Sequence, residues 1–180
     1  MNPIVEKTKI DGCLIIKNIP FVDDRGYFNV PFNLEFYQNL LPEITFVQDN
    51  QSYSKYGVVR GLHYQKYPYE QSKLVRCSYG MVRDVIVDLR IESPSYKEVI
   101  NVDLSGENAV MVFIPKGCAH GFSVLSNEAV FEYKVDAPYN KYADSGIVWN
   151  DETLNIDWGI PLKDAIVSDK DKVLPKFLKI

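Results

Sequence analysis

Two histidines occur in the chain of 180 residues, and histidine is the side chain that most often transfers protons at neutral pH. His63 lies in VVRGLHYQ, a run that is otherwise typical of a buried strand, and His120 lies in PKGCAHGF. His63 could therefore be a packed core residue, a metal ligand or a base for proton transfer. The other residues with chemical potential must decide among these three roles.

A metal site is disfavoured by the small number of histidines. PKGCAHG resembles the second half of a cupin motif, in which Pro-x-Gly is followed shortly by histidine, and cupins are double-sheet jelly rolls. Metal-binding cupins use a cluster of histidines whose first two are spaced H-x-H, whereas GLHYQ supplies one. Two histidines cannot build a three-histidine site, so we expect a cupin scaffold without a metal.

Other chemistries have little support in the motifs. No G-x-S-x-G is present, and Cys118, two residues before His120, is expected to be a small core residue rather than a nucleophile. The sequence contains neither G-x-G-x-x-G nor a Walker loop, so we expect no dinucleotide, ATP or other cofactor.

Alternation along two expected strands places polar side chains on apolar faces. In KLVRCSYG, Lys73 shares a face with Val75 and Cys77, and in VFEYKV, Tyr133 lies between apolar residues of its own face. A polar group buried alone costs about 1–3 kcal/mol, so each needs a partner or a ligand. Acid–base chemistry would use His63 as base, Tyr133 as acid and Lys73 as a cation beside developing negative charge. A core histidine, a packed tyrosine and a surface lysine explain the same pattern, so both alternatives stay open here.

Short strands must position these residues. The apolar stretches are rich in valine and isoleucine and include CLIIKNI, ITFVQ, VVRGLHYQ, KLVRCSYGMVRDVIVDLR, VINVDL, AVMVFIP, FSVLS and AVFEYKV. Turn sequences separate them, which is typical of an all-β sandwich or barrel. A helix is expected at residues 33–43, ending at Pro42, with an apolar face made by Leu34, Phe36, Tyr37, Leu40 and Leu41. A second short helix or turn is expected near the C-terminus, and residues 1–180 are expected to form one domain.

The net charge limits the binding partners that the chain can have, and the cysteines indicate its compartment. The net charge is −4, so no basic field favours nucleic acid or a membrane surface, although a few placed arginines can still bind phosphate. No run approaches the ~18 apolar residues of a membrane span, and MNPIVEKTKIDG lacks a signal pattern. Cys13, Cys77 and Cys118 have no CxxC spacing, and we expect free, buried thiols in a reducing cytoplasm.

Collinear motifs along nearly the whole chain resemble the dTDP-4-dehydrorhamnose 3,5-epimerase family, sugar-nucleotide epimerases on a cupin-type jelly roll. The motifs are DDRGYF (23–28), TFVQDNQS (45–52), VVRGLHYQ (58–65), SKLVRCSYG (72–80), DVIVDLR (84–90), SPSY (93–96), FIPKGCAHGF (113–122), FEYK (131–134), SGIVWND (145–151), IDW (156–158) and SDKD (168–171). The resemblance implies a cofactor-free epimerase that inverts C3, C5 or both of a nucleoside-diphosphate 4-keto-6-deoxy sugar in deoxysugar biosynthesis.

The resemblance also implies a role for each reactive residue. His63 removes the proton beside the C4 ketone, and Asp171 orients His63. Lys73 stabilises the enolate oxygen, and Tyr133 returns a proton from the opposite face of the ring. The substrate-binding residues that it implies are Arg25 and Arg60 for the diphosphate, Tyr139 for stacking on the base, His120 at the sugar end, and Phe28, Gln48, Asn50, Asp144 and Lys170 elsewhere in the site.

One departure from the family pattern concerns the nucleotide. Relatives carry a glutamate shortly after the DxRGxF motif, whereas Asn29 and Val30 occupy that position here, so both dTDP and GDP, with a hexose or a heptose, stay open. The alternatives are a monofunctional 3-epimerase, a 3,4-ketoisomerase, which would not need Tyr133, and a non-catalytic sugar-nucleotide binding module. Family members typically form homodimers by exchanging N-terminal strands, and we expect a homodimer.

Overall fold

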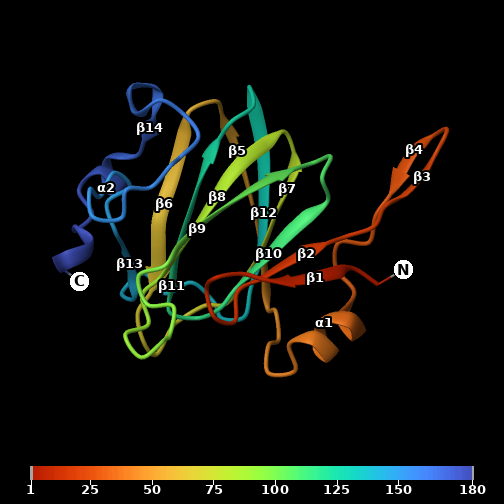
Figure 1. Ribbon diagram of the computed structural model, residues 1–180, viewed down its shortest axis with the longest axis horizontal. Coiled ribbons are helices and arrows are strands. Elements are labelled where there is room, and N and C mark those ends of the chain that lie inside the picture. The colour runs from red at the N-terminus through yellow and green to blue at the C-terminus, as the bar shows by residue number, and fades with distance from the viewer. Residues whose placement is uncertain (1, 180) are drawn as a thin grey trace.

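The structure is a computed structural model that describes residues 2–179, and it consists mainly of antiparallel strands (Figure 1). The strands are β1 (Ile4–Lys7), β2 (Leu14–Lys17), β3 (Phe21–Asp23), β4 (Gly26–Phe28), β5 (Gln48–Lys55), β6 (Val58–Gln65), β7 (Lys73–Tyr79), β8 (Met81–Asp88), β9 (Val99–Ser105), β10 (Val110–Ile114), β11 (Cys118–Val124), β12 (Glu128–Val135), β13 (Asp144–Gly146) and β14 (Ile166–Val167). The helices are α1 (Leu34–Leu40) and α2 (Asp169–Lys172), with 3-10 turns at Leu162–Asp164 and Phe177–Lys179. The all-β prediction is confirmed.

Two sheets face each other and enclose the core. The first has the strand order β1-β2-β10-β7-β12-β5, and the second has the order β13-β6-β11-β8-β9, with the short β14 parallel to β6. Apolar side chains of both sheets meet between them, for example Val75 and Phe131 from the first and Ile86 and Phe122 from the second. This sandwich sets the inward faces of β6, β7, β11 and β12 opposite one another, which is where the candidate residues lie.

Helix α1 covers the outer side of the first sheet rather than the core between the sheets. Asn33 caps its first turn by accepting a hydrogen bond from the Phe36 amide, and Tyr37 is buried against the sheet. Of the predicted apolar face, Leu34 does not join the cluster formed by Phe36, Tyr37, Leu40 and Leu41, and it is 57% exposed at the first turn of the helix. The predicted strand ITFVQ is also wrong, since β5 begins only at Gln48 and residues 44–46 pack beside α1 instead.

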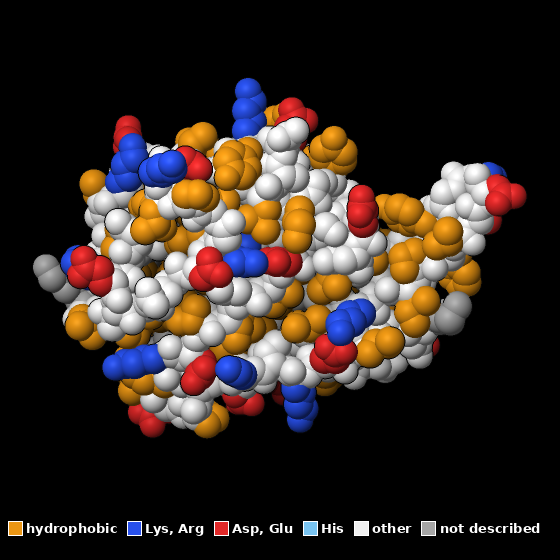
Figure 2. All heavy atoms as spheres, turned by 45° about the horizontal axis from the view of Figure 1, so that its top comes forward, with side chains coloured by type: hydrophobic (Ala, Val, Ile, Leu, Met, Phe, Trp, Pro, Cys, Tyr) orange, Lys and Arg blue, Asp and Glu red, His pale blue; other side chains and the backbone are white. Residues whose placement is uncertain are grey.

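The hairpin β3–β4 projects from the body of the molecule, far from α2 and the C-terminus (Figure 1). Its two strands pair with each other and with no other strand of residues 2–179. All six strand residues are exposed, including Phe21, Val22, Tyr27 and Phe28, and the turn holds Arg25 paired with Asp23. Figure 2 shows apolar side chains gathered where the hairpin leaves the body and charged side chains at its tip.

Within residues 2–179, no helix is long and apolar enough to cross a membrane. All three cysteines are free and buried, as expected, and Cys13, Cys77 and Cys118 all belong to the core between the sheets.

Candidate active site

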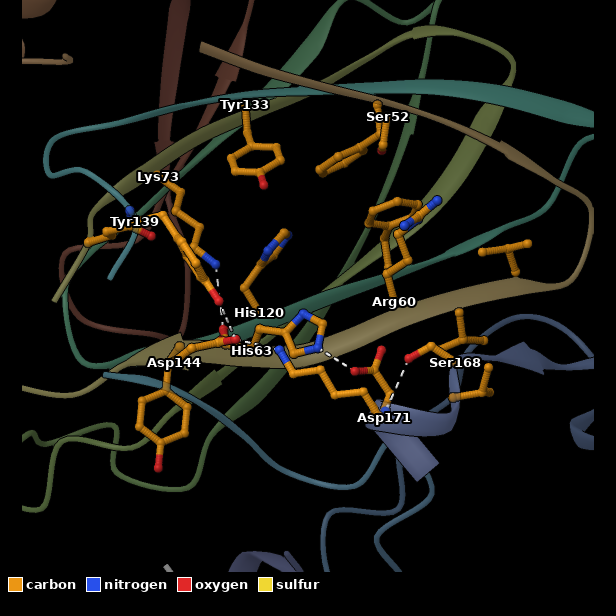
Figure 3. Close-up of a pocket in the computed structure, with 18 of the residues that line it drawn as sticks. Ser52, Arg60, His63, Lys73, His120, Tyr133, Tyr139, Asp144, Ser168 and Asp171 are labelled. Carbon is orange, nitrogen blue, oxygen red and sulfur yellow. Dashed lines mark hydrogen bonds and ion pairs between the residues drawn. The ribbon is translucent and has the colours of Figure 1, made fainter. Parts of the chain in front are cut away.

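A cavity of about 570 Å³ lies between the two sheets at the end nearest α2. Both sheets contribute side chains to it (Figure 3). Nine of the thirteen candidate residues line it, namely Arg60, His63, Lys73, His120, Tyr133, Tyr139, Asp144, Lys170 and Asp171. Residues separated by more than a hundred positions in the chain therefore meet around one space large enough for a sugar and part of a nucleotide.

His63 and Asp171 form a hydrogen-bonded pair at the wall made by the second sheet. His63 lies on β6, and its Nε2 is 2.7 Å from Oδ1 of Asp171. Ser168 caps α2 by accepting from the Asp171 amide, which fixes the carboxylate below the imidazole (Figure 3). Burial works to raise the pKa of Asp171, but the hydrogen bond and the charge of His63 outweigh it and hold that pKa below its usual value. An ionised Asp171 keeps the proton of neutral His63 on Nε2, so Nδ1 is the basic nitrogen.

Tyr133 lies on the opposite wall of the cavity. It is on β12 of the first sheet, and Figure 3 shows its hydroxyl directed into the space above His63. Burial raises the pKa of Tyr133, although the charge of Arg60 works to lower it, so the phenol keeps its proton at neutral pH. A phenol that keeps its proton and an imidazole with a carboxylate partner thus face each other across one cavity.

Lys73 lies at the inner end of the cavity, on β7 beside β12. It is 9% exposed, and its Nζ donates to the backbone carbonyl of His63 over 3.5 Å. Burial lowers the pKa of Lys73 to about 8, although the charges of Asp84 and Asp144 work to raise it. The lysine is therefore charged at neutral pH but surrounded by little water, which makes it a strong donor to any oxygen that gains negative charge nearby.

His120 lies beside His63 and has a carboxylate of its own. The two histidines are directly opposite each other on neighbouring strands β11 and β6. His120 Nε2 is 2.6 Å from Oδ1 of Asp84, which is fully buried on β8. Burial lowers the pKa of His120 although Asp84 opposes this, so the ring is neutral at neutral pH.

Three charged or polar groups join at the rim. The Asp144 carboxylate accepts from the Tyr139 hydroxyl over 2.9 Å and forms an ion pair with Lys170. Burial works to raise the pKa of Asp144, but the hydrogen bonds from Lys170 and Tyr139 lower it overall. Arg60 lies farther along the cavity, where its Nε donates to Ser54 and leaves the rest of the guanidinium free for an anion.

The part of the chain that the structure describes contains no set of side chains arranged to bind a metal ion. No group of three or more histidine, cysteine, aspartate or glutamate side chains is arranged there to hold an ion. The two histidines of the cavity are each bound to a carboxylate instead.

Comparison with known proteins decides the family. A model of the dTDP-4-dehydrorhamnose 3,5-epimerase family matches residues 7–179. The dTDP-4-dehydrorhamnose 3,5-epimerase of Shigella flexneri is 46% identical over 175 residues, which cover 97% of this chain and 96% of the relative. The chain belongs to the dTDP-4-dehydrorhamnose 3,5-epimerase family. Its members of that name are isomerases, and the resemblance noted from the motifs is confirmed.

Solved structures of relatives agree with this assignment. The enzyme of that name from Elizabethkingia anophelis superimposes with a TM-score of 0.94 at 44% identity, covering 99% of this chain and 98% of the relative. A dTDP-6-deoxy-D-glucose-3,5-epimerase from Legionella pneumophila, solved with dTDP-4-keto-L-rhamnose, gives a TM-score of 0.94 at 40% identity, covering 99% and 95%. These similarities confirm the cupin-type jelly roll.

Four of the substrate-binding residues that the family resemblance implies lie outside the cavity. Arg25 and Phe28 are on the projecting hairpin and are exposed, far from the cavity wall. Gln48 and Asn50, on the edge strand β5, bind each other over 2.7 Å, and Asn50 also donates to the Tyr133 carbonyl. Their assignment to the substrate site stays a prediction.

Sequence reasoning missed Ser52, which lines the cavity, and Asp84, which lies behind His120. Asp84 would have been found by the alternation argument applied to Lys73, because it shares a strand face with Val82 and Ile86. Ser52 lines the cavity with a buried hydroxyl that has no hydrogen-bond partner among the described residues, and no sequence pattern distinguishes it from other serines.

Proposed function

We propose that the chain inverts C3 and C5 of a dTDP-linked 4-keto-6-deoxy sugar without a cofactor. The observation that carries this proposal is the position of His63 and Tyr133 on opposite walls of one cavity, with Lys73 beside them. Inversion at carbon requires a base on one face of the ring and an acid on the other. A module that only binds nucleotide sugars would need neither.

The reaction begins with removal of the proton from C3 or C5, next to the C4 ketone. His63 Nδ1 takes the proton, and the carbon–hydrogen electron pair moves into the ketone to give an enolate. Asp171 stabilises the imidazolium that forms, and Lys73 donates to the enolate oxygen. Tyr133 then gives its phenolic proton to the same carbon from the opposite face. His63 releases its proton to water and Tyr133 recovers one, so the enzyme returns to its starting state.

The diphosphate binds at the open end of the cavity. Arg60 supplies one guanidinium there, which suits phosphate oxygens. The other predicted diphosphate ligand, Arg25, is on the hairpin of the same chain and cannot share that cavity, because the hairpin points away from it.

A homodimer resolves this separation. The exposed apolar residues Phe21, Val22, Tyr27 and Phe28 make the hairpin costly as an isolated arm in water. A second copy that receives the arm would cover these side chains and bring the partner's Arg25 and the partner's Phe28 to the cavity. Cyclic twofold dimers are the commonest soluble oligomers, and their two sites are completed by the same exchange.

The nucleotide is expected to be dTDP. The relatives from Shigella flexneri and Elizabethkingia anophelis are named for a dTDP sugar, and the Legionella pneumophila structure holds one. Val30 stands where relatives carry a glutamate, so this chain must recognise thymine by other groups. Calorimetric titration with dTDP and with GDP tests the assignment. Tighter binding of dTDP is expected, and equal or tighter binding of GDP would overturn it.

The compartment that suits this chemistry is the cytoplasm, where nucleotide sugars are available. The three free cysteines fit a reducing environment.

Solvent exchange tests the activity itself. The protein is incubated with dTDP-4-keto-6-deoxyglucose in D2O, and the sugar is followed by proton NMR. Deuterium is expected at both C3 and C5, together with signals of the inverted sugar. Deuterium at C3 alone would indicate a 3-epimerase, and movement of the carbonyl would indicate a ketoisomerase. An absence of exchange would rule out the catalytic proposal.

A further inference from the structure

Asp84 is a buried carboxylate behind His120, outside the lining of the cavity, and the proposed reaction does not use it. It lies on β8, and its side chain shares the inward face of that strand with Val82 and Ile86. Its exposed fraction is 0%, and one oxygen, Oδ2, has no hydrogen-bond partner among the described residues. A buried carboxylate oxygen without a hydrogen-bond partner costs stability, which points to a role for this group beyond packing.

The first group that faces Asp84 is His120. The 2.6 Å contact joins Asp84 Oδ1 to His120 Nε2, so a neutral imidazole carries its proton on Nε2. Nδ1 then has a free lone pair and makes no hydrogen bond with the described residues, while the ring lines the cavity and stacks on Phe131. A bare ring nitrogen is an acceptor, and the natural donors in a sugar are its hydroxyl groups.

The second group is Lys73, which approaches from the opposite sheet. The charged and titratable groups around Lys73 are Asp84 on β8, Asp144 on β13, Cys118 on β11 and His120. The charge of Asp84 works to raise the pKa of Lys73 against the effect of burial, although no ion pair joins the two directly. The acceptor that His120 needs could be a neutral oxygen, whereas support of a buried ammonium requires a negative charge.

We propose that Asp84 is a positioning residue with two effects: it holds His120 as an acceptor for a sugar hydroxyl, and its charge keeps Lys73 protonated for the enolate. This proposal rests on the proposed function, because a sugar and an enolate give both effects their purpose. The hydrogen-bond acceptor alone would not require a carboxylate at this buried position, because an amide oxygen could serve His120 equally well.

The His120 half of the proposal can be tested in the unmodified protein without substrate. The chain has two histidines, so long-range proton–nitrogen NMR of a ¹⁵N-labelled sample contains two ring systems, which His63→Asn assigns. His120 is expected to be neutral at pH 7 with its proton on Nε2. A charged ring, or a proton on Nδ1, would overturn the proposal, and this outcome does not depend on whether the chain epimerises any sugar.

Two variants separate the acceptor from the charge. Asp84→Asn keeps an oxygen for His120 and removes the charge, so the His120 tautomer is expected to persist while Lys73 titrates about one pH unit lower. Asp84→Val removes both, so the two tautomers of His120 should become mixed as well. Lys73 is followed by ¹³C NMR of lysine-labelled protein and assigned with Lys73→Met.

Asp88→Asn is the matched control. Asp88 is also fully buried on the same face of β8, but Arg90, Ser93 and Ser95 hold it away from the cavity. This variant is expected to lower the melting temperature and leave both His120 and Lys73 unchanged. A Lys73 midpoint that is the same in Asp84→Asn as in the wild type would refute the charge effect. An equal shift in Asp88→Asn would show that it reflects general loosening of the core.

Discussion

The two histidines of the cavity have the same kind of partner but different surroundings. Each directs Nε2 toward a buried carboxylate, yet the side chain of His63 is 33% exposed whereas that of His120 is 7% exposed. Water can help to solvate a charged His63, while a charged His120 would lie in the core. The difference supports the proposal that His63 transfers protons and that His120 binds the sugar by a hydrogen bond.

Asp171→Asn tests the support that His63 receives. An amide cannot stabilise the imidazolium as a carboxylate does and can favour the wrong tautomer, so kcat should fall by a factor on the order of 10³–10⁴. Asp169→Asn, in the fully exposed position two residues earlier in α2, is the matched control and should keep kcat. A loss of less than tenfold in Asp171→Asn would mean that His63 does not depend on this partner.

Lys73 should make activity and stability respond to pH in opposite directions. Its folded pKa of about 8 is lower than the ordinary value of 10.5, so the rate should fall as pH rises through 8 and the enolate loses its cation. The same shift means that the unfolded chain binds more protons between pH 8 and 10.5, so this group adds stability as pH rises through that window.

The Lys73→Met variant tests whether the buried charge of Lys73 lowers the free energy of unfolding at neutral pH. At pH 7 it removes a buried charge that costs up to about 3 kcal/mol, so it should be inactive but more stable to denaturant. The gain in unfolding free energy over the wild type should disappear as pH rises from 8 to 10.5. A variant that is less stable than the wild type at pH 7 would contradict the burial effect.

At the scale of elements, neighbouring strands bring together residues that are far apart in the chain. Strand alternation predicted the inward positions of Lys73 and Tyr133, and the same argument would have found Asp84. It could not pair His63 with Asp171, because that contact spans 108 positions and depends on how α2 folds back on β6. Only the family resemblance suggested the pair. The projection of the hairpin has no signal in the sequence, because its strands make no contact in a sheet with the rest of residues 2–179.

The hairpin can be tested by mixing two inactive variants. Neither Arg25→Ala nor His63→Ala should be active alone, since one lacks a diphosphate ligand and the other the base. If Arg25 acts in the partner's cavity, a mixed dimer has one complete site, and random mixing should restore about a quarter of all sites. Activity is measured after the two are denatured and refolded together, with each refolded alone as control. No recovery in a verified mixed dimer would place Arg25 in its own chain's site, and activity of Arg25→Ala refolded alone would place Arg25 outside any site.

At the scale of the whole molecule, the sandwich provides two rigid walls for a reaction that needs two sides. The second sheet carries His63, α2 carries its carboxylate partner Asp171, and the first sheet carries Tyr133 and Lys73, the proposed acid and cation. The all-β fold followed from the spacing of apolar runs and turns, whereas the width of the cavity depends on side-chain packing across sheets that no local pattern encodes. That residues 1–180 act as one domain and as a homodimer stays a prediction.

The most direct test of an acid and a base on opposite walls is the Tyr133→Phe variant. Its exchange of sugar protons for deuterium in D2O is followed by NMR and compared with that of the wild type. The variant keeps His63 and Lys73, so it should still remove protons and exchange C3 and C5 with solvent. Without the phenolic acid, inversion should slow by a factor on the order of 10²–10⁴, and most deuterium should appear in the starting sugar. Loss of exchange and inversion to the same extent would contradict the account, because the acid and the base would then not act from separate walls.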